Sequence, residues 1–443
     1  MDVRSPNIVN TNALHGRWEK LWIPLGSVIV LACHFLLLGH NPADDASWWQ
    51  VVKGDEKNFF RELFNILHWQ FSNTPAWSIN NLLGSVHLLG DISLLTILQA
   101  FLHWRSMVVF ASLFPGYRPF IVLIFLNPLV FHYFNLESPE FISFFIVTLL
   151  LRSMTRNDHA GILLLTAALS VVNIKFHFVL VAALIVGLFI LWKARGIRLR
   201  WSILLWSLAI VCILPVKNLA LHGSFGHTYW LKFNVDHNYA TGFVNEETER
   251  EYIRTHPQDN SISPYVSYER NPWNSYIQRD FLKQLKWSDI TDGILALGPK
   301  RILKKWRRNV DIFFRSPIDY PPFFKHGYHD GLDLVRFSQK IDRFYWLDSD
   351  TGVGLKGTGY LSLYHLLYPL LIAASLFIMA RRRKIDILAV LVCAFFYFIL
   401  TTIVIDGKES NRMRFGIEPV FYFMLFTVID YLRPAQQAAE SET

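Results

Sequence analysis

Residues 21–39 read LWIPLGSVIVLACHFLLLG, an apolar run of the length that crosses a bilayer as a single helix. No small-residue cleavage site follows before Asn41-Pro42, so the run is predicted to remain as an anchor and not to be removed as a signal peptide. Two adjacent carboxylates, Asp44 and Asp45, come directly afterwards. The first span therefore carries an acidic pair at one end.

The composition of the whole chain indicates a membrane protein. Of its 443 residues, 52 % are hydrophobic and 18 % are charged, and the mean hydropathy is +0.27. These values exclude an ordinary soluble enzyme. We expect an all-α polytopic membrane protein with about ten transmembrane helices and a large extracytoplasmic loop region. The spans are predicted near Leu21–Gly39, Leu83–Leu102, Phe120–Phe134, Phe141–Leu151, Gly161–Val172, Phe178–Trp192, Ile203–Ala220, Tyr360–Ala380, Ile385–Ile405 and Ile417–Leu432.

The placement of Lys and Arg predicts the orientation, because these residues are retained on the cytoplasmic ends of membrane helices. Basic residues precede span one, follow span four, and separate spans two and three, six and seven, and eight and nine. Both termini are then cytoplasmic, and Asp44 and Asp45 lie outside. The formal charge of +8 comes largely from these clusters, so membrane lipids are expected as partners and nucleic acid is not.

Four regions follow from this pattern: an N-terminal transmembrane module (1–220) with a catalytic first external loop, an extracytoplasmic cap (221–359), C-terminal transmembrane helices (360–433) and a disordered tail (434–443). The cap contains two stretches with helical apolar spacing, Tyr276–Trp287 and Pro299–Phe314. The second stretch carries six cations, which are Lys300, Arg301, Lys304, Lys305, Arg307 and Arg308.

Two absences favour a bacterial inner membrane, with the active site on the periplasmic face. Cys33, Cys212 and Cys393 all lie in predicted spans, which leaves no external cysteine for a disulfide or a zinc site. The external loops also lack an Asn-x-Ser/Thr acceptor. The endoplasmic reticulum membrane is the alternative if the chain is eukaryotic.

Acids and bases gather at the external ends of the predicted helices. Because such residues are costly near a membrane, we treat them as candidates for function. The candidate catalytic residues are Asp44 and Asp45, and the candidate substrate-binding residues are Glu137, Glu140, Lys175, His177, Lys408, Arg412, Arg414 and Glu418.

The last external loop places Lys408, Arg412 and Arg414 on the side that positive charge normally avoids. A phosphate would compensate them, since the planar fork of Arg matches phosphate oxygens. Alternatively, the cations pair with Glu409, with Glu418 or with lipid headgroups. Both interpretations remain open on the sequence.

The acidic candidates also have two explanations. In Asp44-Asp45, two like charges side by side raise one pKa toward the range of a general base, whereas an Asp is equally suited to cap a helix that starts near Ala46. Glu137 and Glu140 stand at the start of span four, where an acid also complements the helix dipole.

The remaining titratable residues are weaker candidates. Lys175 and His177 lie near a span boundary, where a charged side chain can snorkel to the interface. A Lys on the outside nevertheless opposes the usual bias. Lone histidines such as His34, His87 and His132 are expected to be packed or interfacial, and no metal site is predicted.

Taken in order, these features resemble the GT-C superfamily of membrane glycosyltransferases. The likeness rests on a first helix followed by an external acidic pair, an acidic residue opening span four, and an Arg-bearing loop before the final helix. It is closer to relatives of protein O-mannosyltransferases and lipid A aminoarabinose transferases, and it covers most of the chain as an ordered layout. Further similar stretches are residues 214–226, Tyr229-Trp230 and residues 298–306.

The resemblance implies transfer of a sugar, with inversion, from a polyprenyl-phosphate donor to a hydroxyl on the external face. The acceptor would be a lipid-linked glycan, a lipid or a protein. Asp44 or Asp45 would act as the general base. The chemistry needs no metal, because Arg and Lys can neutralise the leaving phosphate, although a divalent ion would be compatible with it.

The same resemblance implies that Arg412 or Arg414 holds the donor phosphate, with help from Lys175 or Lys408. The loop reads Arg-Met-Arg-Phe where the family commonly has an Arg-Tyr pair. Which of the two arginines binds the phosphate is therefore open.

Two other classes of function are alternatives. One is a polymerase or ligase of lipid-diphosphate-linked glycans, for which a longer cationic groove is expected. The other is a lipid-glycan transporter, which would show inverted repeats and broken helices around a midplane site. The sequence has no such repeat, and its ionisable residues gather at one face.

Overall fold

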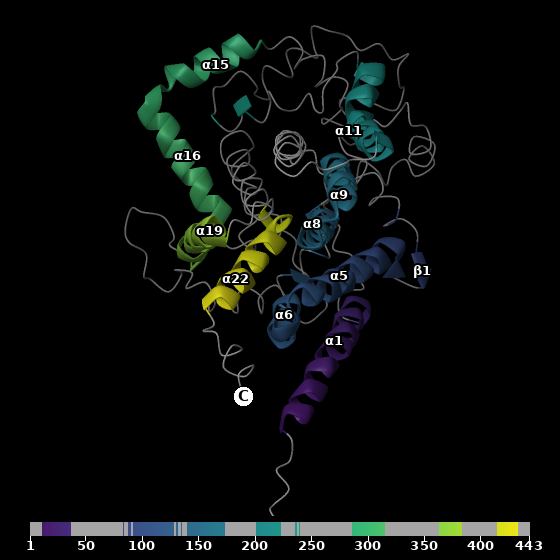
Figure 1. The fold of residues 1–443 in the computed structure, drawn as a ribbon. Coiled ribbons are helices and arrows are strands. Elements are labelled where there is room, and N and C mark those ends of the chain that lie inside the picture. The colour runs from purple at the N-terminus through teal and green to yellow at the C-terminus, as the bar shows by residue number, and fades with distance from the viewer. Residues whose placement is uncertain are drawn as a thin grey trace, which may run out of the picture.

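The computed structural model is a bundle of helices (Figure 1). It describes residues 11–36, 83, 87–89, 92–127, 130–131, 134, 140–172, 201–222, 235–236, 239, 286–314, 363–382 and 414–432. Ten α-helices lie in these ranges, so the expected helical fold is confirmed at that level. The sheet structure of the described residues is one two-stranded hairpin.

The elements follow one another through the bundle from α1 to α22. In chain order they are α1 Thr11–Leu36, β1 His87–Leu89, β2 Ile92–Ser93, α5 Leu94–Leu113, the 3-10 helix η2 Pro115–Tyr117, α6 Arg118–Phe125, α8 Glu140–Thr155, α9 His159–Val172, α11 Trp201–His222, α15 Trp287–Ala296, α16 Gly298–Phe314, α19 Leu363–Arg382 and α22 Glu418–Leu432. Neighbours in space include α1 with α5, α5 with α8, α8 with α9, α9 with α11, and α19 with α22. In Figure 1, α15 and α16 form an arm along one edge of the molecule.

Most of the predicted spans that fall on described residues coincide with helices. Spans four, five, seven, eight and ten correspond to α8, α9, α11, α19 and α22, and the basic stretch of the cap corresponds to α16. These segments have long apolar or amphipathic patterns at helical spacing. Spans six and nine lie outside the described residues, as does most of the stretch Tyr276–Trp287.

The second predicted span is wrong in its position. The apolar pattern predicts a helix over Leu83–Leu102, whereas α5 runs over Leu94–Leu113. An antiparallel pairing of β1 with β2 occupies the preceding residues, and Ser93 caps α5 by accepting a hydrogen bond from the Thr96 amide at 3.2 Å. Arg105, expected in a loop between spans, therefore lies inside a helix.

The third predicted span, Phe120–Phe134, is also not one continuous helix. Helix α6 ends at Phe125 and a turn follows at Leu126 and Asn127. Asn127 precedes a proline in the sequence, and the residue before a proline is disfavoured in helical geometry. The apolar run alone does not reveal this break.

Aromatic side chains form the core where α5, α6, α8 and α22 meet. Phe110, Phe125, Phe134 and Phe144 are fully buried. Phe144 stacks on Phe415 with ring centroids 4.9 Å apart and an interplanar angle of 25°. This contact holds the beginning of α8 against the segment that leads into α22.

Helix α1 approaches α6 and α5 closely at Gly26. A Cβ atom at this position would lie 2.8 Å from Val122 Cγ1 and 3.2 Å from Met107 Sδ, so only glycine fits without a shift. A hydrogen bond also joins α1 to α5 next to this glycine, because Trp104 Nε1 donates to Ser27 Oγ at 2.9 Å. The absence of a side chain at Gly26 thus allows α1 to pack closely against α5 and α6.

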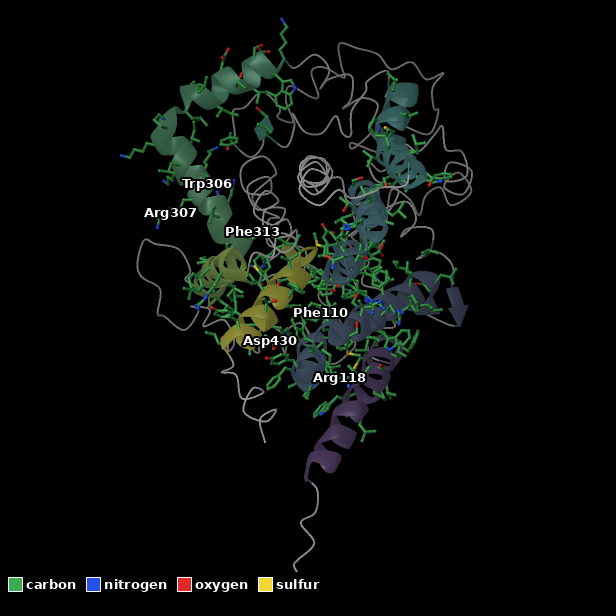
Figure 2. All side chains as sticks on the ribbon, viewed as in Figure 1. Phe110, Arg118, Trp306, Arg307, Phe313 and Asp430 are labelled. Atoms are coloured by element: carbon green, nitrogen blue, oxygen red, sulfur yellow. The ribbon has the colours of Figure 1, made fainter. Side chains whose placement is uncertain are left out.

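A hydrogen bond joins η2 to the C-terminal helix α22. The Tyr117 hydroxyl donates to Asp430 Oδ1 at 2.8 Å, and Figure 2 shows Asp430 beside the segment that contains Arg118. A second bond, from Arg381 Nη1 to the Tyr431 hydroxyl at 3.0 Å, ties α19 to the same end of α22. Hydrogen bonds therefore join the C-terminal part of α22 to both η2 and α19.

By length and apolar composition, one described helix could cross a membrane, and it is α5, Leu94–Leu113. Three shorter apolar helical stretches accompany it: Leu21–Phe35, Pro115–Phe125 and His159–Val172. The polytopic topology stays a prediction.

Candidate functional site

Three of the ten candidate residues lie in the described part of the chain: Glu140, Arg414 and Glu418. The other seven lie outside it, and they are Asp44, Asp45, Glu137, Lys175, His177, Lys408 and Arg412. The three described candidates lie at the start of α8 and at the entry into α22. That Asp44 and Asp45 lie close to the loop of Lys408 and Arg412 stays a prediction.

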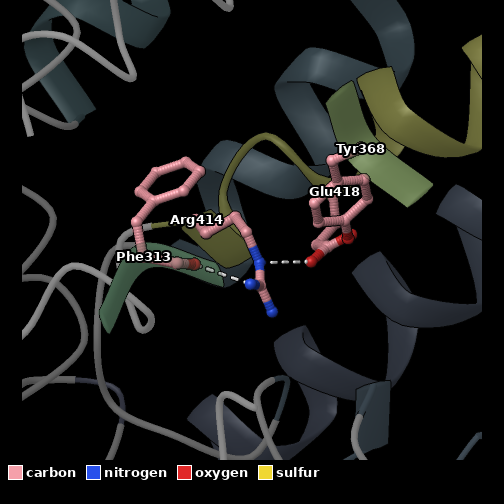
Figure 3. Close-up of polar contacts among 4 residues, drawn as sticks. All are labelled: Phe313, Tyr368, Arg414 and Glu418. Carbon is pink, nitrogen blue, oxygen red and sulfur yellow. Dashed lines mark hydrogen bonds and ion pairs between the residues drawn. The ribbon is translucent and has the colours of Figure 1, made fainter. Parts of the chain in front are cut away.

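Arg414 is fully buried and is held by two groups (Figure 3). Its Nε donates to Glu418 Oε1 at 2.9 Å, which makes an ion pair one helical turn apart. Its Nη1 donates to the backbone carbonyl of Phe313 at 2.6 Å. The guanidinium therefore joins the end of α16 to the first turn of α22.

Glu418 is the first residue of α22 and is buried as well. The Tyr368 hydroxyl donates to its Oε2 at 2.6 Å, so both carboxylate oxygens accept a hydrogen bond. A negative charge at a helix N-terminus is also stabilised by the helix dipole. The Tyr368 ring adds a cation–π contact, with Arg414 Cζ 5.4 Å from the ring centroid.

These contacts define the anchor cluster: Phe313, Tyr368, Arg414 and Glu418. The four residues come from α16, α19, the entry to α22 and α22 itself. Buried charges require partners of this kind. Of the two interpretations of Arg414 left open by the sequence, the pairing with Glu418 is present in the structure.

Glu140 begins a helix that packs against the entry to α22. It is the first residue of α8 and is fully buried. Phe144, one turn further along α8, stacks on Phe415, which is adjacent in sequence to Arg414. The first turns of α8 and the entry into α22 therefore pack against each other, and the clustering of the charged residues stays a prediction.

A polar pair that sequence reasoning missed lies deeper in the bundle. His34 and His103 are both fully buried, and His34 Nε2 lies 2.9 Å from His103 Nδ1. The sequence pattern predicts a packed or interfacial His34 and does not indicate His103 as its partner. Among the described residues, no group of three His, Cys, Asp or Glu could hold a metal ion.

Helix α16 contributes a basic surface next to the anchor cluster. Lys305, on its inner side, donates from Nζ to the Tyr239 carbonyl. Burial lowers the pKa of the Lys305 ammonium and the nearby Arg308 cation acts in the same direction, whereas Asp236 opposes them.

The chain was compared with protein-family models, with curated proteins and with solved structures, and it matches none of them.

Proposed function

We propose that this protein is an integral membrane glycosyltransferase that transfers a sugar from a polyprenyl-phosphate donor to an acceptor hydroxyl, with inversion. The observation that carries the proposal is the packing of α8, which begins at the buried Glu140, against the entry to α22, which holds the buried Arg414–Glu418 pair. This packing supports the proposal, because the reaction needs acids and cations at one end of the helices. We expect the site on the periplasmic face of a bacterial inner membrane.

Exposed apolar side chains support the membrane location. Large apolar residues stand at the surface of α1, α6, α11 and α19, where water would be an unfavourable solvent. On α11 these residues are Leu205, Trp206, Leu208, Ile213, Val216 and Leu219.

The proposed reaction is a single displacement at the anomeric carbon of the donor sugar. The acceptor hydroxyl oxygen forms a bond to this carbon while the bond from the carbon to the donor phosphate oxygen breaks. Asp44 or Asp45 accepts the hydroxyl proton. Polyprenyl phosphate leaves with the electron pair, and its charge is neutralised by the loop cations Lys408 and Arg412.

In this scheme Arg414 is a positioning residue. It is bound to Glu418 and to the Phe313 carbonyl, so it fixes the C-terminal end of the loop that carries Lys408 and Arg412. The anchor cluster holds that end at the start of α22.

The test is to replace Asp44 and Asp45 separately with Asn in the full chain and to assay membranes with matched expression. The probe is a polyprenyl phosphate carrying a radiolabelled hexose, and the readouts are label in acceptor material and release of free polyprenyl phosphate. At least one variant should lose roughly 100-fold or more in rate, which is the typical contribution of a general base. Asp55→Asn, an equal change in the same loop, is the control and should keep full activity. Full activity in both test variants would overturn the assignment of the base.

A second candidate function is favoured by the basic helix α16. A polymerase or ligase that moves lipid-diphosphate-linked glycans needs a longer cationic surface, and α16 presents five exposed cations. The same membranes supplied with a polyprenyl-diphosphate glycan distinguish the two reactions. Release of polyprenyl diphosphate and not of the monophosphate would establish the second one.

A further inference from the structure

Helix α16 distributes its six basic side chains over two faces. Lys305 lies on the inner face with Trp306 and the buried Asn309, and it binds the Tyr239 carbonyl. Figure 2 shows Arg307 on the outer side of the helix, whereas Phe313 lies at the end that meets α19 and α22. The outer cationic face is formed by the exposed residues Lys300, Arg301, Lys304, Arg307 and Arg308.

Within the described ranges, no ion pair joins any member of the outer cationic face to an acid. Several of these residues are also neighbours on the helix, since Lys304 is four positions from Lys300 and from Arg308 and three from Arg307. Like charges at these spacings destabilise a helix. An anionic surface would offset this repulsion.

The arm of α15 and α16 also exposes large apolar side chains. Trp287 is 44 % exposed at the start of α15, Leu295 is 70 % exposed near its end, and Leu303 is 60 % exposed on α16. Water is a poor solvent for these groups, and a soluble polyanion would offer them no apolar surface. Helices that lie in a membrane interface combine Lys and Arg with Trp and Leu in this way.

We propose that the arm formed by α15 and α16 docks on an anionic bilayer surface, with the phosphates of phospholipid headgroups bound by the outer cationic face. The attachment of α16 supports this position. Its last turn contacts α19, and the Phe313 carbonyl accepts a hydrogen bond from Arg414 at the entry to α22. Both α19 and α22 coincide with predicted spans, so the arm begins close to the bilayer. This inference goes beyond the proposed reaction and does not depend on its chemistry.

The experiment compares amide hydrogen exchange of the full chain in nanodiscs of phosphatidylcholine alone and of equal parts phosphatidylcholine and phosphatidylglycerol. Exchange in the peptide covering residues 298–314 should be slower by roughly tenfold in the anionic discs, because binding the helix opposes its local opening. High salt should remove the difference, because it screens exposed charges. The peptide covering residues 363–382 serves as the internal reference and should not change.

The triple variant Lys300→Gln, Lys304→Gln, Arg307→Gln should lose the difference between the two kinds of disc. The matched control Arg195→Gln, Arg198→Gln, Arg200→Gln removes the same charge from the predicted loop between spans six and seven, and it should keep the difference. If the triple variant does not fold, the salt dependence of the unmodified protein decides. Equal exchange in both discs at low salt overturns the proposal, as does slowing by inorganic polyphosphate in phosphatidylcholine discs without any slowing by phosphatidylglycerol.

Discussion

His34 Nε2 lies 2.9 Å from His103 Nδ1, so one hydrogen bond joins the last part of α1 to the middle of α5. His103 Nε2 lies 2.9 Å from the Phe125 carbonyl oxygen, and because a carbonyl only accepts, this nitrogen carries the proton. In two neutral rings His103 Nδ1 is then the acceptor and His34 Nε2 the donor. Two successive hydrogen bonds, each donated toward the Phe125 carbonyl, thus link α1 through α5 to the end of α6.

Replacing His103 with Phe should destabilise the protein more than replacing His34 with Phe. The first change leaves both the Phe125 carbonyl and the His34 N–H without a partner, whereas the second leaves only His103 Nδ1. Each buried polar group left unpaired costs about 1–3 kcal/mol. Thermal unfolding in detergent, compared between the two variants, measures the difference.

The ring contacts make phenylalanine a suitable replacement at position 103. The His103 ring stacks on Phe134 with centroids 4.5 Å apart and an interplanar angle of 12°, and a Phe ring keeps this packing. The loss should therefore report the hydrogen bonds. Equal losses in the two variants would contradict the direction assigned to the two hydrogen bonds.

Gly26→Ala should destabilise the contact between α1 and α6. The added methyl would lie 2.8 Å from Val122 Cγ1, and a buried β-branched side chain has little freedom to move. Overpacking of this kind costs about 1–3 kcal/mol. The loss should appear as a lower unfolding temperature, and Val122→Ala in the same chain should restore part of it. Gly116→Ala is the control, since nothing lies within 4 Å of its Cβ position.

Glu418→Leu should be among the most destabilising single changes in the described part of the chain. It leaves the buried Arg414 cation without its carboxylate, and breaking a buried ion pair on one side costs about 3–5 kcal/mol. The double variant Arg414→Met, Glu418→Leu should recover part of this loss, because no charge is then buried. Tyr368→Phe removes one hydrogen bond to the carboxylate and should cost less, about 2 kcal/mol. A double variant less stable than Glu418→Leu, measured by thermal unfolding, would show that the pair does not act in this way.

Much of the helical arrangement could be predicted because its segments carry strong patterns. Helices α8, α9, α11 and α22 are long apolar runs, and α16 has an apolar stripe opposite its cations. The position of α5 could not be predicted in this way. Its start depends on the hairpin of β1 and β2 and on the Ser93 cap, and neither changes the apolar content of the run.

In the candidate site, too, contacts between residues close in sequence could be predicted, and contacts between distant residues could not. The spacing of Arg414 and Glu418 is the one at which side chains meet on a helix, so their pairing could be predicted. The Phe313 carbonyl comes from 101 positions away in the sequence, and Tyr368 lies 50 positions from Glu418. His103 was missed for the same reason, since 69 positions separate it from His34. Contacts of this kind follow from the packing of the helices and not from any local pattern.

The two arginines of the last loop should separate into a binding residue and a positioning residue. Arg412→Gln should lower the rate of sugar transfer by roughly 100-fold or more, since it removes a cation from the leaving phosphate, and should leave the unfolding temperature unchanged. Arg414→Gln should lower the unfolding temperature, because it leaves the buried Glu418 carboxylate without its cation.

Arg414→Lys tests whether the charge at position 414 is sufficient, or whether the two hydrogen bonds of the guanidinium are also needed. A Lys keeps the charge but lacks the fork that reaches Glu418 and the Phe313 carbonyl together, so it should restore only part of the stability. Transfer assays and thermal unfolding on the same preparations give both readouts. If Arg412→Gln reduced stability as much as Arg414→Gln while activity fell equally in both, the two residues would form one structural unit. The donor phosphate would then have to be held by other cations, of which Lys408 and Lys175 are the remaining candidates.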